Sequence, residues 1–361
     1  MRTPTSDLPI DALVPLGWNE AVSKIYSKFH HPGRYPGRVL RVDRGSSQIA
    51  THEGTITAAL IREEPPPGAE SGGPTSGDWV VIRPDPDHGE VIEAILPRRS
   101  AISRLDPSAP VTRPAVQVLA ANVDRVFVVH GLDRPPHPGR IERSLVVAWE
   151  SGAQPTVVLT KADLLDSEAV AQTVLDLESL APGVEIVALS NLSGAGIEAL
   201  LPFVQSGVTV ALIGASGTGK SSLVNRLALT DVQSTGDTRH VDGKGRHTTT
   251  SRDLIPLPSG AVLIDTPGLR EVGLWNSWEG LELAFEDIIA LTGSCRFRDC
   301  SHRTEPGCAV AEAIADGRLE QRRLESFRKL ELELAEQERQ TARQKRGESP
   351  RPPPPTPDDD W

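Results

Sequence analysis

The sequence has no uninterrupted apolar run of 18 residues, and its N-terminus has no basic start followed by an apolar stretch. We therefore expect neither a membrane-spanning helix nor a signal peptide. Cysteine is scarce, because only Cys295, Cys300 and Cys308 occur, all in one short segment. An odd, clustered set in a chain without an export signal predicts a cytoplasmic protein with a metal site in place of disulfides.

An excess of positive charge is also missing, since the net charge is −11. The acidic residues are dispersed, however, and phosphate contacts depend on local basic faces because salt screens distant charges. We therefore expect RNA contacts on residues 24–44 and just after the first β domain, with basic residues Lys24, Lys28, Arg34, Arg38, Arg41, Arg44, Arg98, Arg99 and Arg104. Nearby aromatic residues could stack on bases, although core packing is their commoner fate; these are Trp18, Tyr26, Phe29 and Tyr35.

The N-terminal third predicts an irregular arm over residues 1–35 and a small β domain over residues 36–105. Short apolar stretches separated by turn residues predict five strands, which fit an OB-like barrel that contacts RNA. These stretches are residues 37–42, 48–52, 55–61, 78–84 and 90–96. Residues 62–78 are rich in Pro and Gly and predict a long exposed loop. A β domain without any ligand is the alternative.

Residues 115–275 alternate Val/Ile/Leu-rich runs with helical segments, which predicts one α/β domain with a parallel sheet buried on both faces. Helices are expected near 167–180, near 195–204 and after Lys220. Residues 276–335 predict a helical zinc-binding domain, and the Pro-rich acidic residues 336–361 a disordered tail. Residues 318–346 have a helical pattern that fits a solvated helix and an RNA-facing helix equally well.

The segment that begins at Gly214 matches the phosphate-loop pattern GxxxxGK[ST] and follows an apolar strand. Its glycines let backbone N–H groups turn toward phosphate oxygens, and the next helix adds the positive end of its dipole. We expect Lys220 to reach the β and γ phosphates and Ser221 to bind Mg²⁺. The predicted nucleotide-binding residues here are Gly214, Ala215, Ser216, Gly217, Thr218, Gly219, Lys220, Ser221 and Ser222.

Two further segments predict contacts at the γ-phosphate. Asp265 ends an apolar strand in "VLIDTPG", where a carboxylate can hold the Mg²⁺ shell and the Gly268 N–H can meet the γ-phosphate. The long polar segment before it contains the run Thr248, Thr249 and Thr250. One of these hydroxyls is expected to add a second Mg²⁺ contact and to order the segment when γ-phosphate is present.

The turn Thr160-Lys161-Ala162-Asp163 has the Lys-X-Asp form with which many GTP-binding proteins read guanine, yet it precedes the phosphate loop. Six strands are expected near 123–130, 156–160, 184–189, 208–213, 253–257 and 261–264, so the usual set is complete but rotated in order. A sheet tolerates this because only the connections change. The sequence therefore predicts a circularly permuted GTPase.

Four residues near the C-terminus suit tetrahedral zinc: Cys295, Cys300, His302 and Cys308. This Cys₃His set leaves no open catalytic position, so it predicts a structural ion. Because the segment is short and polar, the metal is expected to hold it folded. Three buried thiols beside an unrelated His are the alternative.

The permuted order, "GASGTGKSSLVN", "GRHTTT", "DTPG" and the Cys/His spacing together resemble the ribosome-small-subunit-dependent GTPase A family, RsgA, also called YjeQ. The resemblance covers residues 36–330. It implies an OB barrel, a permuted GTPase and a zinc domain, with Mg²⁺-dependent hydrolysis of GTP to GDP stimulated by the 30S subunit. The implied role is late maturation of that subunit, with 16S rRNA as partner and no membrane. We expect a monomer.

Two positions depart from what GTPases usually carry. The family has Asn where this chain has Thr160, and a hydroxyl bridges fewer partners than an amide, so we expect guanine preference with weaker affinity. Leu269 stands where many GTPases place the water-orienting Gln. His247 resembles the family's catalytic His and is expected to orient the water, although an exposed or RNA-contacting loop His is the alternative. Residues 190–194 match the family's other guanine-facing loop only loosely.

Two other functions fit some of these features. One is a nucleotide-gated rRNA-binding module in which hydrolysis is incidental. The other is a P-loop ATPase or kinase, which Asp163 disfavours because its carboxylate is suited to guanine N1 and N2. Turnover with and without 30S subunits separates the first alternative from a subunit-dependent GTPase.

Overall fold

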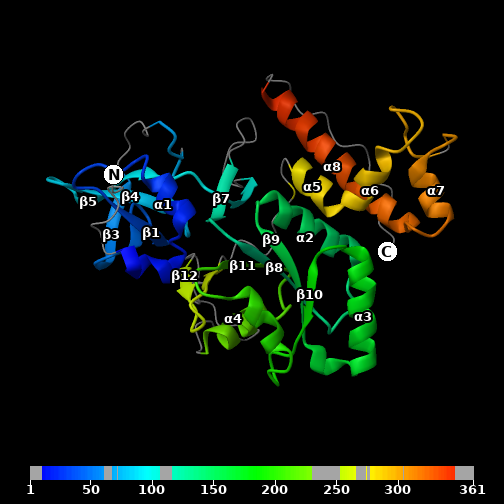
Figure 1. Ribbon diagram of the computed structural model, residues 1–361, viewed down its shortest axis with the longest axis horizontal. Helices are drawn as coiled ribbons and strands as arrows, with labels where there is room; N and C mark the ends of the chain where they lie inside the picture. The colour runs from blue at the N-terminus through cyan, green and yellow to red at the C-terminus, as the bar shows by residue number, and fades with distance from the viewer. Residues whose placement is uncertain are drawn as a thin grey trace, which may run out of the picture. The chain divides into compact units, whose positions relative to one another are not determined.

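A computed structural model of the 361-residue chain describes residues 10–60, 67–70, 72–105, 116–229, 253–265, 274, 277–303 and 305–345. The chain divides into two compact units (Figure 1). One comprises residues 1–103 and 118–272, and the other residues 104–117 and 273–361. Among the helices of the described ranges, none is long and apolar enough to cross a bilayer.

The first unit begins with a closed five-stranded barrel, as the sequence predicts. Its strands follow the order β1-β2-β3-β5-β4, in which β3 and β5 are parallel and the other pairs antiparallel. Alternate residues of the strands fill the interior with branched aliphatic side chains, including Val39, Ile49 and Ile82. The strands are β1 (Tyr35–Val42), β2 (Ser47–Thr51), β3 (Gly54–Leu60), β4 (Trp79–Asp85) and β5 (Gly89–Ile95).

The N-terminal residues pack on the outside of this barrel through η1 (Ile10–Leu16) and α1 (Glu20–Tyr26). Asn19 caps α1 by accepting a hydrogen bond from Val22 N at 3.1 Å. Trp18 meets Trp79 edge to face, with ring centroids 5.2 Å apart. Trp18, Tyr26 and Phe29 are buried in this cluster, so core packing is the correct alternative for them and base stacking is not.

The segment before β4 differs from the exposed loop that its Pro and Gly content predicts. Thr75, Ser76 and Asp78 are all buried. Asp78 accepts two hydrogen bonds from the Arg98 guanidinium, each of 2.8 Å, and one from Thr75 N. The prediction was wrong at this end of the loop because a buried carboxylate needs fixed partners, and these hold the backbone in place.

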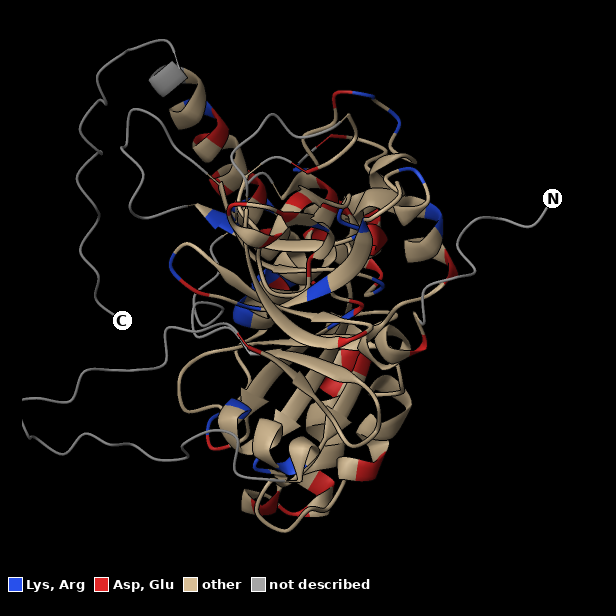
Figure 2. Cartoon of the chain, turned by 90° about the vertical axis from the view of Figure 1, so that its left-hand side faces the viewer, with Lys and Arg blue, Asp and Glu red and all other residues tan. Residues whose placement is uncertain are grey.

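The basic surface that the sequence predicts for RNA contact is smaller in the structure, because several of its arginines are buried or paired with carboxylates. Arg38 is only 1% exposed, Arg98 is committed to Asp78, and Arg34 forms an ion pair with Glu93. Figure 2 shows Asp and Glu interspersed among Lys and Arg on the described elements. Of the basic residues in 24–44, Lys24, Lys28 and Arg44 are exposed. Arg38 and Arg98 are therefore structural residues, and the prediction that they contact RNA was wrong.

A six-stranded sheet and the helices that accompany it form most of the rest of the first unit, and the strand order is β10-β9-β8-β11-β13-β12. The three strands that come first in the chain occupy one half of the sheet, and β11, β13 and β12 occupy the other. This arrangement confirms the permuted order. The strands are β8 (Arg125–Gly131), β9 (Gln154–Thr160), β10 (Glu185–Ala188), β11 (Thr209–Ile213), β12 (Asp253–Pro256) and β13 (Val262–Asp265).

One strand corrects the expectation of a wholly parallel sheet. β12 runs antiparallel to β13, whereas the other neighbouring pairs are parallel. Residues 257–261 connect β12 to β13 directly, and so short a connection can form a hairpin but not a parallel crossover.

Helices accompany this sheet at α2 (Pro138–Glu150), α3 (Ser167–Leu180) and α4 (Lys220–Ala228), with η2 (Ala162–Leu164) after β9. Leu223 and Val224 of α4 share a core with Phe127 and Val158 of the sheet. The helix expected near 195–204 is the 3₁₀ helix η3 (Ile197–Phe203), which contains Pro202. The ribbon of β6 (Ala101–Leu105) and β7 (Val116–Ala121) was not predicted.

The second unit contains α5 (Trp278–Ala284), α6 (Glu286–Thr292), α7 (Ala309–Ala315) and α8 (Gln321–Lys345). Arg323 of α8 is 4% exposed, pairs with Asp287 at 2.6 Å and stacks on the Phe285 ring. Residues 336–345 continue α8 in place of the disordered tail predicted there, since they are mostly good helix formers. Residues 346–361 lie outside the described ranges.

Candidate nucleotide site and metal centre

The phosphate-loop sequence lies between β11 and α4, at the carboxyl edge of the sheet. Gly214 has φ 148°, and a Cβ there would lie 2.3 Å from Val129 O, so only glycine fits beside β8. Lys220 Nζ donates to Gly214 O at 2.7 Å and also to Ala215 O. The ammonium therefore lies inside the loop, on carbonyl groups that it can exchange for phosphate oxygens. Ser221 and Ser222 follow in the first turn of α4.

The Lys-X-Asp turn begins at Thr160, the last residue of β9, whose side chain is buried. Thr160 Oγ1 donates to Thr218 O at 2.6 Å, so the end of β9 is tied directly to the phosphate loop. Lys161 has left-handed backbone angles, φ 60° and ψ 32°, an arrangement that is costly for a non-glycine residue and common at functional sites. Its Nζ lies 2.9 Å from Asp133 Oδ1 and lowers the pKa of the Asp133 carboxyl.

A third loop, residues 190–194, completes the cluster. The buried Ser190 hydroxyl donates to Asp163 Oδ1 and so fixes the carboxylate expected to read guanine. Asn191 Nδ2 donates to Gly219 O at 3.0 Å. Loops that follow β9, β10 and β11 thus meet at one edge of the sheet. The sequence indicated Ser190 and Asn191 only through a loose loop match, and it gave no indication of Asp133.

Five of the predicted site residues lie outside the described ranges: His247, Thr248, Thr249, Thr250 and Gly268. Asp265 ends β13, and its backbone pairs with Asp253 of β12. β13 is the direct neighbour of β11, so the end of β13 and the start of the phosphate loop lie at the same edge of the sheet.

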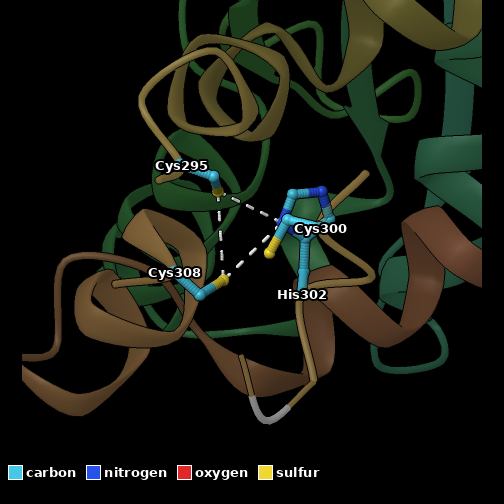
Figure 3. Close-up of side chains that lie close together, drawn as sticks. All are labelled: Cys295, Cys300, His302 and Cys308. Carbon is cyan, nitrogen blue, oxygen red and sulfur yellow. Dashed lines mark hydrogen bonds between the residues drawn. The ribbon is translucent and has the colours of Figure 1, made fainter. Parts of the chain in front are cut away.

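The four residues with zinc-ligand spacing converge in the second unit, as Figure 3 shows. Their ligand atoms all lie within 4.8 Å of one another. Cys295 Sγ is 4.0 Å from Cys308 Sγ, and His302 Nδ1 is 3.4 Å and 3.6 Å from those two sulfurs. Tetrahedral zinc with Zn–S bonds of about 2.3 Å requires sulfur–sulfur separations of about 3.8 Å, so the donor set fits this ion.

The thiols of this cluster differ in acidity. Burial raises the pKa of Cys300 to about 11. Burial also opposes ionisation of Cys308, but hydrogen bonds from Ala311 N–H and the neighbouring thiols outweigh it and lower the pKa of Cys308. Metal binding must therefore displace protons at neutral pH.

Known proteins agree with this architecture. A sequence model described as RsgA GTPase matches residues 95–275. Two relatives are each named small ribosomal subunit biogenesis GTPase RsgA. The one from Streptomyces avermitilis is 46% identical, with 88% of this chain and 84% of the relative covered. The one from Syntrophotalea carbinolica is 41% identical, with 89% of each chain covered.

Two solved structures resemble the chain. YjeQ from Thermotoga maritima has a TM-score of 0.60 and 27% identity, covering 84% of this chain and 99% of the other. YloQ, described as a circularly permuted GTPase, has a TM-score of 0.59 and 22% identity, covering 85% of this chain and 97% of the other. At this identity it supports the fold alone. The predicted resemblance is confirmed: this chain belongs to the RsgA GTPase family.

Proposed function

We propose that this protein binds GTP and GDP, with Mg²⁺, between the three loops after β9, β10 and β11, and acts in late maturation of the small ribosomal subunit. Hydrolysis is coupled to release of the protein from the 30S particle. The observation that carries the proposal is the hydrogen bond from Thr160 to Thr218 O, which joins the base-reading turn to the phosphate loop. The relatives' names, small ribosomal subunit biogenesis GTPase, supply the partner.

In the proposed site, Asp163 accepts hydrogen bonds from guanine N1 and N2 and Lys161 lies along the base. The Ser190 hydroxyl already restricts the Asp163 carboxylate, which supports this role. Lys220 and the loop N–H groups stabilise the negative charge on the transferred phosphoryl group. Thr249 or Thr250 and Gly268 act at the γ-phosphate, and His247 orients the attacking water, since Leu269 cannot.

Ser221 and Asp265 are the residues that would hold Mg²⁺. Ser221 is in the first turn of α4, and Asp265 ends the strand beside β11. A hydroxyl and a carboxylate from these positions suit Mg²⁺, which prefers oxygen ligands. The ion supplies charge neutralisation on the phosphate oxygens.

Cys295, Cys300, His302 and Cys308 would hold one structural Zn²⁺ in the second unit. Their separations and the absence of a fifth donor from the cluster of described residues support a closed site. The ion contributes folding free energy to the segment between α6 and α7, where the chain has little apolar core of its own.

The division into an arm (1–35), a barrel (36–105), a GTPase domain (115–275), a zinc domain (276–335) and a tail stays a prediction, with the tail reduced to residues 346–361 because α8 extends to Lys345. So do the contact of the barrel with 16S rRNA, the monomeric state and the cytoplasmic location. Exposed Lys24, Lys28 and Arg44 are the residues of the N-terminal basic segment that support the RNA contact.

The test is GTP hydrolysis by the full chain with added 30S, 50S or 70S particles. Strong stimulation by 30S subunits, lost in Lys220→Ala, is the expected result. Equal turnover with all three particles, or none above the free protein, would contradict the proposal. Binding to 30S that depends on nucleotide but brings no stimulation would favour the gated RNA-binding module.

A further inference from the structure

Two consecutive carbonyl groups of the phosphate loop, Thr218 O and Gly219 O, are each held by a side chain from a different loop. Thr160 Oγ1 donates to Thr218 O at 2.6 Å, and Asn191 Nδ2 donates to Gly219 O at 3.0 Å. Thr160 is the last residue of β9, and Asn191 follows the neighbouring strand β10. The phosphate loop is therefore fixed from the side on which the base is proposed to bind.

The donors differ in capacity. A hydroxyl has one hydrogen to donate, and Thr160 directs it to Thr218 O, so it has none left for Gly219 O. A carboxamide has two hydrogens and an acceptor. The amide that a hydroxyl at position 160 cannot provide is supplied here by Asn191.

Gly219 lies close to both donor side chains, Thr160 and Asn191. Gly219 has φ 85°, and a Cβ there would lie 3.1 Å from both Thr160 Oγ1 and Asn191 Nδ2. Asn191 Oδ1 is buried and makes no hydrogen bond with the described residues. Gly219 O also accepts a hydrogen bond from Leu223 N at 2.9 Å, so turning the amide over would bring Asn191 Oδ1 against a second acceptor, and Nδ2 must face Gly219 O.

We propose that Asn191 is a positioning residue for nucleotide binding, which performs from the loop after β10 the carboxamide function that Thr160 cannot perform. Ser190 and Asn191 then have separate tasks, since Ser190 orients Asp163 and Asn191 holds Gly219. The inference rests on the proposed guanine nucleotide site. A Thr at position 160 therefore does not weaken the base-reading turn, because Asn191 supplies the carboxamide that Thr160 lacks.

The test is titration of the full chain with a fluorescent mant-GDP probe. Asn191→Ala removes the side-chain donor to Gly219 O and is expected to raise Kd about 10-fold, the effect of losing one hydrogen bond. Asn191→Asp keeps the volume but places an acceptor against Gly219 O, so its Kd is expected to rise at least as far. Thr160→Asn alone is expected to change Kd less than threefold.

Rescue distinguishes positioning from general support of the fold. In the double variant Thr160→Asn/Asn191→Ala, the carboxamide is lost at position 191 and supplied at position 160. The Kd for mant-GDP is then expected to lie within about threefold of the value for the unmodified protein. Failure of this rescue, or unchanged Kd in both Asn191 variants, would overturn the inference. Gln172→Ala, which removes an exposed carboxamide on α3, is the matched control and should leave Kd unchanged.

Asp163→Ala separates this inference from the proposed site. If Asp163→Ala weakens mant-GDP binding at least 100-fold while Asn191→Ala leaves Kd unchanged, the site stands and the role of Asn191 is wrong. If Asp163→Ala has no effect, the proposed site itself is wrong. Circular dichroism and the thermal midpoint of unfolding check that each variant is folded. If Asn191→Ala does not fold, the Kd of Asn191→Asp for mant-GDP tests the role of Asn191.

Discussion

Arg38 on barrel strand β1 donates from its guanidinium to the Thr209 hydroxyl on β11, at 2.9 Å. The same side chain donates to Leu16 O, Gly77 O and Asn122 O, and lies over the Trp79 ring. Burial lowers the pKa of Arg38 to about 10, so the guanidinium still carries its charge at neutral pH. A buried cation thus connects the barrel to the strand that leads into the phosphate loop.

Arg38→Ala is expected to lower the free energy of unfolding of the first unit by about 3 kcal/mol, because Leu16 O, Asn122 O and the Thr209 hydroxyl lose the donor that the guanidinium provides. Thr209→Val should cost about 1 kcal/mol, the value of one buried hydrogen bond. Urea unfolding followed by far-ultraviolet circular dichroism measures both. The exposed Arg44→Ala should stay within about 0.5 kcal/mol. An equally small effect of Arg38→Ala would show that the connection is not structural.

Asp163→Asn is expected to change the nucleotide preference of the protein from GTP to XTP. Guanine presents donors at N1 and N2, whereas xanthine has a carbonyl group at C2, which an amide can meet with its own donor. Loss of two hydrogen bonds to a charged acceptor should weaken GTP binding about 100-fold. Competition of GTP, ATP and XTP for the purified protein measures this. Equal binding of ATP and GTP by the unmodified protein would remove the guanine assignment.

His247→Ala is expected to leave mant-GDP affinity within about twofold but to lower 30S-stimulated turnover by about 10²–10⁴-fold, the usual contribution of a positioned acid–base group. The physical reason is that Leu269 has no polar atom with which to orient water. Single-turnover hydrolysis with saturating 30S subunits is the measurement. Unchanged stimulated turnover would assign His247 to the loop surface or to RNA contact.

One Zn²⁺ per chain is expected by elemental analysis, and none in Cys308→Ser. Removal of the metal should reduce the helical signal of the second unit while mant-GDP affinity stays within about twofold, because the nucleotide-site residues belong to the first unit. Retention of zinc by Cys308→Ser would contradict the ligand assignment.

Zinc affinity is also expected to fall as the pH falls. The pKa of Cys300 in the metal-free protein is raised to about 11, so this thiol is protonated at neutral pH and must lose its proton to bind. Each proton released should change the apparent affinity about tenfold per pH unit. Competition with a chelating dye between pH 6 and 8 measures the slope, and a slope of zero would show that the thiols are not ligands.

The sequence by itself determined the order of the motifs, the five barrel strands, the six strands of the sheet and the Cys₃His spacing. These features depend on residues close together in the chain, whose apolar periods, glycines and ligand spacings are visible without a fold. The permutation was predictable for the same reason, because each motif identifies its own strand.

Only the tertiary structure decided how Arg38, Arg98, Thr160 and Asn191 are used. Arg38 and Thr209 are 171 positions apart, and Thr160 and Thr218 are 58 apart. No local pattern reveals such partners, so Arg38 and Arg98 looked like RNA contacts and Thr160 like a weakened base reader. Burial turned both arginines into structural residues, since a charge removed from water must find fixed partners within the protein.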